Sequence, residues 1–258
     1  MQAITSKDLL RAFKEPRFQT SAEVEQFVAD VGPLEAADAQ ALFAVLLDRR
    51  GMTDIKVHRF RCALFKRLMA NSTHLRELFS VFLRSAKQAD PDVRQMLLEV
   101  LPVINAVGAH REVVAFFRSP EAELRAFGKA LAERIGGKTM FGLLVELCEA
   151  PDFYGRVEAM EAAVAMAGYH AIPALQRALR VGTASEKLRA LELLGDAEII
   201  TKNRDGALEA ISGALEDLSE EVVTAAISAF GAIGAEDDYF RYVTPRLETA
   251  SLPVVRAI

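Results

Sequence analysis

The chain has 258 residues, of which 51% are hydrophobic, and a formal net charge of −5 at pH 7. This apolar content is enough for a substantial buried core, and it excludes a disordered chain. The apolar residues are mainly Ala, Leu and Val, with no Trp and only 7% aromatic residues, which favours closely packed helices over strands. We therefore expect an all-α fold.

Three features indicate a cytoplasmic protein without a membrane span. Charged side chains crowd the segment from Lys7 to Arg17, where a signal peptide would need an apolar run. The longest weakly polar run, Val222 to Ala235, is shorter than the roughly 18 residues that a spanning helix needs. Cys62 and Cys148 are isolated thiols in a chain with no other cysteine, which is typical of a reducing compartment.

A recurring pattern divides the chain into repeats, in which a capping residue and a short acidic or proline-containing turn precede an apolar anchor. The anchors are Val24, Val57, Val93, Leu124, Val157, Leu188, Val222 and Val254. Their successive separations are 33, 36, 31, 33, 31, 34 and 32 residues, which suits one helical hairpin per repeat. We expect the five anchors from Val93 to Val222 to be equivalent buried positions.

Helix starts and stops recur in step with the anchors. Side chains that can accept a hydrogen bond from a first-turn amide stand three residues before an anchor at Ser21, Asp54, Asp90, Ser185, Ser219 and Ser251. Pro91 and Pro120 suit a first helical turn. Glycine adopts the left-handed C-terminal conformation at low cost, and the expected helix stops are Gly108, Gly136, Gly168 and Gly234.

Other apolar patterns with helical spacing, at 75–82, 141–148 and 172–179, fall between these helices, so each repeat has two antiparallel helices. We predict one right-handed α-solenoid domain of about eight helical hairpins over 1–258. It comprises a degenerate N-terminal cap (1–32), weaker repeats (33–90), clear repeats (91–250) and an incomplete repeat (251–258). That last helix barely begins before Ile258, which favours the hypothesis of a longer protein over a short terminal helix.

The sequence resembles HEAT repeats from about Val93 onward. Ala171–Leu179 with Ser185–Leu191 looks like the first and second helices of such a repeat, and Asp90–Arg94 and Ser119–Ala126 are similar. The resemblance is nearest to the short repeats of bilin-lyase-type HEAT proteins, and it implies the α-solenoid fold.

The resemblance also implies a structural role for Arg94, Arg125 and Arg189, each of which directly follows its anchor. These arginines are expected to form a ladder of hydrogen bonds and ion pairs between neighbouring repeats, although Glu158 and Val223 break the pattern. Because arginines that recur at one repeat position serve the stack, this role is favoured over ligand binding.

No motif indicates catalysis or a cofactor. Gly136-Gly-Lys-Thr139 echoes the end of a phosphate-binding loop, but Ala132 occupies the position of that loop's first glycine and a helix is expected before it. His58 and Cys62 could place two metal ligands on one helix face, yet no further ligand accompanies them, and a half-buried histidine beside a core cysteine is favoured. We expect no catalytic, cofactor-binding or metal-binding residues.

Charge is distributed unevenly along the sequence. The segment from Arg49 to Arg76 carries eight basic residues and one acid, Asp54, whereas Asp205 to Phe240 carries nine acids and no Lys or Arg. On a helix, one side of the basic segment would present a basic stripe of Lys56, Arg59, Lys66 and Arg67. An ordinary solvated face is one interpretation; a partner-binding surface for an acidic protein segment or another polyanion is the other.

The leading functional hypothesis is a non-enzymatic scaffold or adaptor that binds a protein partner along an extended surface. An alternative is nucleic-acid or polyanion binding through residues 49–76, which the net charge of −5 opposes. A bilin-lyase-like or other cofactor-handling protein is a third hypothesis, and it rests on the family resemblance alone.

Overall fold

The computed structural model describes residues 4–15, 17–31, 36–46, 60–63, 83–84, 86–87, 94–95, 98, 110–151 and 153–244. These residues form helices and turns, with one isolated β-bridge between Ile4 and Val31 and no strand among them, so the expected all-α fold is confirmed for this part of the chain. Within the same residues, no helix is long and apolar enough to cross a membrane. The chain divides into two compact units, Met1–Phe116 and Phe117–Ile258.

The first unit contains α1 (Ser6–Lys14), α2 (Ser21–Ala29), α3 (Ala36–Leu46) and most of α7 (His110–Phe117). Thr5 and Asp8 form a capping box at the start of α1. Thr20, not the expected Ser21, caps α2 by accepting a hydrogen bond from the Glu23 amide. The ring of Phe18 stacks on that of Phe60 at 4.7 Å. The segment predicted as a degenerate cap therefore contains two properly started helices.

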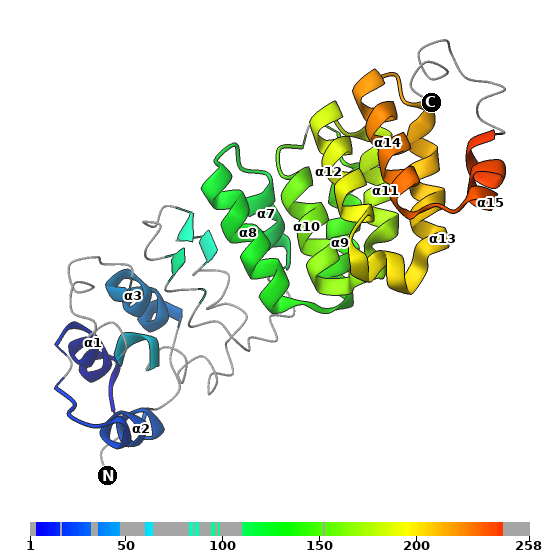
Figure 1. Ribbon diagram of the computed structural model, residues 1–258. Helices are drawn as coiled ribbons and strands as arrows, with labels where there is room; N and C mark the ends of the chain where they lie inside the picture. Colours follow the sequence, from blue (N-terminus) through cyan, green and yellow to red (C-terminus); the bar gives the residue numbers. More distant parts are fainter. Residues whose placement is uncertain are drawn as a thin grey trace. The chain divides into compact units, whose positions relative to one another are not determined.

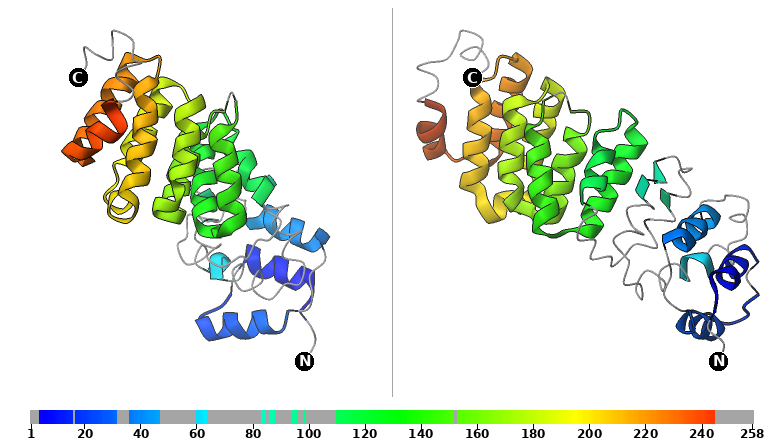
Figure 2. Two further views of the ribbon diagram at one scale, coloured as in Figure 1. Left: turned by 90° about the vertical axis from the view of Figure 1, so that its right-hand side faces the viewer. Right: turned by 180° about the vertical axis from the view of Figure 1, so that it is seen from behind.

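The second unit contains two rows of helices (Figure 1). The helices are α8 (Ala122–Ile135), α9 (Gly137–Glu149), α10 (Arg156–Ala167), α11 (Ile172–Val181), α12 (Ala184–Leu194), α13 (Ala197–Gly213), α14 (Glu220–Ile233) and α15 (Glu236–Asp238). Short helical turns occur at η2 (Gly168–Ala171), η3 (Ala214–Glu216) and η4 (Tyr239–Val243). One row runs α8, α10, α12, α14 and the other runs α9, α11, α13, so each helix packs beside the next but one in sequence (Figure 2).

The core of the second unit lies between the two rows. Most of its buried side chains are apolar, and they include Phe127, Leu131, Leu144, Met160, Leu175, Leu191, Leu208 and Phe230. Alanines fill the closest approaches, with Ala159, Ala163, Ala174 and Ala178 fully buried. The packing through small residues that the composition favours is present here.

Two of the expected glycine stops have a positive φ, although their ψ values of −161° and −127° lie outside the left-handed helical region. Gly136 ends α8 with φ +60° and Gly168 ends α10 with φ +52°, a region that other residues rarely adopt. Gly234 also ends α14, but its φ is −78°. A Cβ there would lie 2.8 Å from a ring carbon of Phe230, so the glycine serves close packing. Gly108 lies outside the described residues.

The capping residues follow the prediction less closely. Thr183 caps α12 through a capping box with Glu186, so the assignment of this role to Ser185 is wrong. Ser219 does stand at the N-cap of α14, but its side chain makes no capping hydrogen bond. The sequence pattern therefore places the helix starts to within two residues without identifying each cap.

The expectation of equivalent buried anchors is half right. Leu124 and Val222 are buried, Val157 and Leu188 are only half-buried, and Val93 lies outside the described residues. The difference in burial follows from the position that each anchor has within its helix. Leu124 and Val222 are each the third residue of their helix, whereas Val157 is the second residue of α10 and Leu188 the fifth of α12, and each residue of displacement rotates a side chain by about 100°.

Candidate interaction surface

The basic stripe cannot be placed on a surface, because Lys56, Arg59, Lys66 and Arg67 lie outside the described residues. Arg61 of the same segment is described, and its side chain is buried in the first unit, with 4% of the residue exposed. One of the eight basic residues counted between 49 and 76 therefore belongs to the interior.

In the second unit, Arg125 links its own turn to the neighbouring helix. Its Nε donates to Glu158 Oε1 on α10 at 2.8 Å, and its Nη1 donates to the carbonyl oxygens of Ser119 and Pro120 at 3.2 and 2.8 Å. The guanidinium thus satisfies backbone acceptors that precede α8 while it pairs with α10. Glu158, which breaks the arginine pattern in the sequence, accepts the hydrogen bond from Arg125.

Arg156 makes a comparable set of contacts one hairpin later. It donates to the carbonyl oxygens of Cys148 and Ala150 at the end of α9, at 3.0 and 2.5 Å, and to Glu186 Oε2 on α12 at 2.5 Å. Its side chain is only 4% exposed. Burial of this charge is tolerated because a carboxylate and two carbonyls surround it.

Lys187 continues the series, because its Nζ donates to Asp217 Oδ2 at 2.5 Å, just before α14. The three contacts from Arg125, Arg156 and Lys187 therefore connect the N-terminal ends of α8, α10, α12 and α14 in turn. Near the opposite end of α14, Arg204 donates to the Ile233 carbonyl at 2.9 Å and pairs with Asp238.

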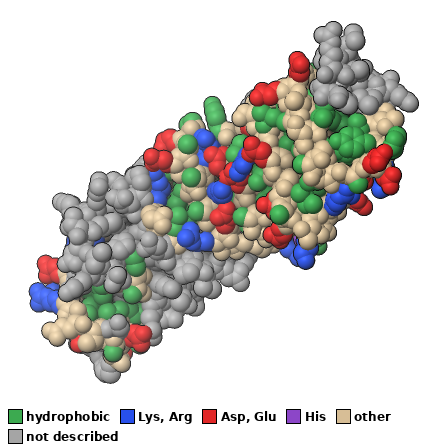
Figure 3. Space-filling model, in the orientation of Figure 1, with side chains coloured by type: hydrophobic (Ala, Val, Ile, Leu, Met, Phe, Trp, Pro, Cys, Tyr) green, Lys and Arg blue, Asp and Glu red, His purple; other side chains and the backbone are tan. Residues whose placement is uncertain are grey.

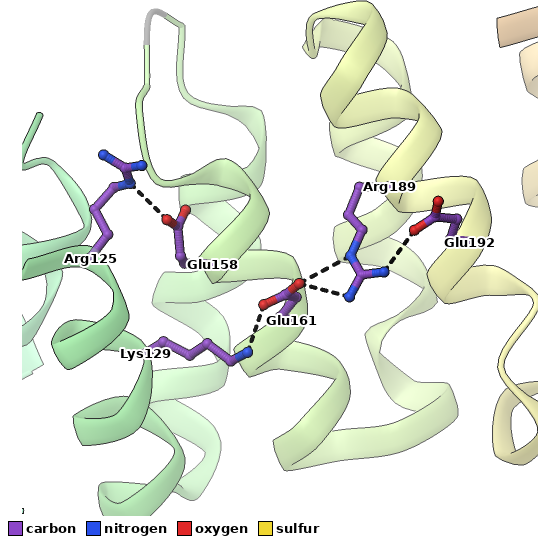
Figure 4. Close-up of polar contacts among 6 residues, drawn as sticks. All are labelled: Arg125, Lys129, Glu158, Glu161, Arg189 and Glu192. Atoms are coloured by element: carbon purple, nitrogen blue, oxygen red, sulfur yellow. Dashed lines mark hydrogen bonds and ion pairs between the residues drawn. The ribbon is translucent and has the colours of Figure 1, made fainter. Parts of the chain in front are cut away.

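A second network crosses the exposed side of the same row (Figure 4). Glu161 on α10 accepts hydrogen bonds from Lys129 on α8 at 2.6 Å and from Arg189 on α12 at 3.0 and 2.8 Å. Arg189 also donates to Glu192 at 2.7 Å. One carboxylate therefore joins three helices.

Hydrogen bonding sets the protonation of this network. Burial of Glu161 opposes its ionisation, but the hydrogen bonds from Lys129 and Arg189 outweigh that effect and lower its pKa below 4.5. The hydrogen bonds of Arg189 to Glu192 and then to Glu161 raise the pKa of the guanidinium above its ordinary value. Both groups are thus charged across the physiological pH range.

The arginines predicted as a ladder have different surroundings. Arg125 and Arg189 make the contacts between helices described above, and Arg94, in the first unit, is buried with 7% exposed. Sequence reasoning missed Arg156, Lys187 and Glu161. A signal for the first two was present, because Arg94, Arg125, Arg156 and Lys187 follow one another at intervals of 31 residues.

The glycine string and the cysteine and histidine side chains are the features that could have indicated catalysis or metal binding. Gly136 ends α8 and α9 begins at Gly137, so the Gly136-Gly-Lys-Thr139 string is a helix stop and start rather than a phosphate loop after a strand. Burial raises the pKa of the Cys148 thiol to about 12, which disfavours a thiolate nucleophile. Cys62 is half-buried, and His58 lies outside the described residues. No cluster of three potential metal ligands occurs in the described part of the chain.

The face formed by α8, α10 and α12 carries side chains of both charges. Acidic and basic side chains intermingle across it (Figure 3), and most of those in Figure 4 are partly exposed. Such a surface can present a fixed pattern of charge to a partner. No protein-family model matches the chain, and no curated protein matches it either.

Proposed function

We propose that this protein is a non-enzymatic scaffold whose HEAT-like helical hairpins stack as a right-handed α-solenoid and bind a protein partner along an extended surface. The observation that supports the proposal is the pair of helix rows in the second unit, in which α8, α10, α12 and α14 pack successively side by side. In a stack of this kind each hairpin contacts only its neighbours, so the exposed surface grows with every added hairpin.

The contacts between helices support the same proposal. The pairs Arg125–Glu158 and Arg156–Glu186 each join one helix of the row to the next, and Lys187–Asp217 joins α12 to the turn before α14. This is the kind of nearest-neighbour interaction on which a repeat stack depends. It also holds the exposed side chains of the row in fixed relative positions, which lowers the conformational cost of binding.

The charge pattern favours a protein partner over a nucleic acid. A surface for nucleic acid carries clustered basic residues of one sign, whereas Glu158, Glu161 and Glu192 alternate with basic residues on α8, α10 and α12. Within this proposal the basic stripe of Lys56, Arg59, Lys66 and Arg67 binds an acidic segment of the partner, and the solenoid positions it.

The proposal is tested by isolating the partner with the full-length chain and measuring its affinity by calorimetry. Changing Lys56, Arg59, Lys66 and Arg67 to Glu should weaken binding by at least about tenfold, because the new charges repel an acidic segment. A matched variant reverses four exposed basic residues elsewhere: Arg111, Arg134, Lys138 and Lys202. It should bind within about twofold of the parent.

Two results would overturn this assignment. Equal loss of binding in both fourfold variants would show that net charge, and not the stripe, determines association. Copurifying material that disappears on nuclease treatment, with affinity that falls steeply as salt rises, would favour the nucleic-acid alternative.

A further inference from the structure

Exposed large hydrophobic side chains are few in the described residues, and their positions are not scattered. They are Tyr154, Val181, Leu218 and Phe240, with 66%, 45%, 105% and 67% of the residue exposed. Tyr154 lies between α9 and α10, Val181 ends α11 before α12, and Leu218 lies between η3 and α14. Three of the four therefore occupy the same kind of turn, the one that joins a helix of one row to a helix of the other.

These three turns lie along one edge of the second unit (Figure 1). Arg156, the first residue of α10, pairs with Glu186 in the first turn of α12. Lys187 in that same turn pairs with Asp217, which directly precedes Leu218. The N-terminal ends of α10, α12 and α14 are thus adjacent, and the turns that lead into them form a continuous row. We call this row, with Tyr154, Val181 and Leu218 as its apolar members, the turn edge.

Charge changes sign along the turn edge. Arg180 precedes Val181 and is 63% exposed, and the partly exposed Arg177 stands one helical turn before it. Both pair with Glu149, at 3.3 and 2.8 Å, and the two arginines with this one acid leave the flank positive. Glu220 and Glu221 follow Leu218, and both are exposed. The apolar row therefore has a basic flank at the turn between α11 and α12 and an acidic flank at the turn before α14.

The basic and acidic flanks of the turn edge complement those of a second copy that lies in the opposite direction. A two-fold rotation places the same patch on both subunits, so that the basic flank of one copy meets the acidic flank of the other and the reverse contact forms at the same time. A basic or an acidic partner would complement only one half of the edge, whereas a second copy complements both halves.

We propose that the turn edge is a self-association surface, on which a second copy of this chain docks in antiparallel orientation. Val181 of one copy packs near Leu218 of the other, and Arg180 lies opposite the second copy's Glu220. The opposite charges fix the register, and the apolar side chains supply the favourable burial. The surface is separate from the mixed-charge face of α8, α10 and α12, and the proposal does not depend on the scaffold function.

The size of the edge sets the expected strength. Neighbouring helices are spaced by about 10 Å, so the two turns that overlap in this register, those of Val181 and Leu218, extend over about 10–20 Å. They bury less than the roughly 800 Å² per partner of stable dimers. The chain should be monomeric at low micromolar concentration. Dimers should become detectable at about a few hundred micromolar.

Sedimentation equilibrium of the full chain over this concentration range tests the proposal. Leu218→Ser should raise the dimer dissociation constant by at least about fivefold, because it removes the most exposed apolar side chain of the turn edge. Phe240→Ser is the matched control, since it removes another exposed hydrophobic residue outside the turn edge, and it should leave the constant unchanged. Circular dichroism establishes that each variant is folded.

A charge swap tests the antiparallel register. Arg180→Glu and Glu220→Lys should each weaken association at least about fivefold, and the double variant should recover it, because both opposed pairs are re-formed with reversed sign. Glu133→Lys, a similar reversal at an exposed residue near the end of α8, should have no effect. A chain that stays monomeric at the highest concentration overturns the proposal, as does an Arg180→Glu, Glu220→Lys double variant weaker than both single variants.

Discussion

At the scale of single residues, Arg156 shows how a buried charge stabilises this unit. Its guanidinium is only 4% exposed and donates to Glu186 and to two carbonyl oxygens at the end of α9. Arg177 makes an ion pair with Glu149 at 2.8 Å, but about 40% of both side chains is exposed. The two arginines thus have similar ion-pair geometry and different burial.

We predict that Arg156→Met lowers the free energy of unfolding by about 2–4 kcal/mol, because it leaves a carboxylate and two carbonyls without their buried donor. Arg177→Met should cost less than about 1 kcal/mol, because solvent already screens its ion pair. Urea denaturation of both variants measures the difference. Equal losses would mean that burial does not determine the contribution of these pairs.

A second prediction at this scale concerns pH. The native pKa of Glu161 lies below its unfolded value of 4.5, so its carboxylate stabilises the fold above pH 4.5, and this contribution is lost as the pH falls through the native pKa. Glu161→Gln should therefore be less stable than the parent at pH 6, and the gap should close toward pH 3. Melting temperatures across this range measure the gap. For the exposed Glu146→Gln variant, the gap should be negligible throughout, and a constant gap for Glu161→Gln would contradict the assignment.

At the scale of helices, the sequence predicted where helices start and stop better than it predicted which side of each helix is buried. The stops at Gly136 and Gly168 depend on local backbone conformation, which a single residue type can indicate. Burial of an anchor depends on which face its helix turns toward its neighbours. Leu188 is only half-buried, although it has the same spacing from its predicted cap, Ser185, as the buried Val222 has from Ser219. Register is set by packing between helices, so spacing along the chain could not determine it.

Substitutions at the anchors test whether the buried and half-buried positions contribute differently to stability. Leu124→Asp and Val222→Asp should each lower the free energy of unfolding by at least about 3 kcal/mol, because an unpaired charge would be buried. Val157→Asp and Leu188→Asp should cost about half as much or less, since both side chains are half-buried. Denaturant titrations of the four variants measure the order. A similar cost at all four sites would restore the equivalence that the sequence suggested.

Packing between elements also depends on one glycine. A Cβ at Gly155, in the turn before α10, would lie 2.3 Å from the Phe117 carbonyl oxygen at the end of α7. Gly142, on α9, has nothing within 4 Å of the same position. Gly155→Ala should lower the free energy of unfolding by at least about 1 kcal/mol, whereas Gly142→Ala should raise it by about 0.5–1 kcal/mol. Thermal melts of the two variants should shift in opposite directions, and a neutral Gly155→Ala would exclude the close approach.

At the scale of the whole molecule, the periodic sequence predicted a repeat architecture and part of its polar network. Arg125 and Arg189 could be selected because they follow apolar anchors. Arg156 precedes its anchor and was missed, although it lies midway in the 31-residue series from Arg125 to Lys187. Glu161 gave no signal, because its role depends on Lys129 and Arg189, which are 32 and 28 residues away in sequence and meet only after the helices pack.

Small-angle X-ray scattering tests most directly the proposal that the full chain is one extended stack of helical hairpins. About eight hairpins at about 10 Å each give a maximum dimension near 80 Å and a radius of gyration above about 22 Å, compared with about 18 Å for a compact domain of this length. The measurement uses the Leu218→Ser variant at low micromolar concentration, so that self-association does not contribute. An asymmetric distance distribution that extends to about 80 Å is the predicted result, and a symmetric one that ends near 50 Å with a radius of gyration of about 18 Å would contradict the claim.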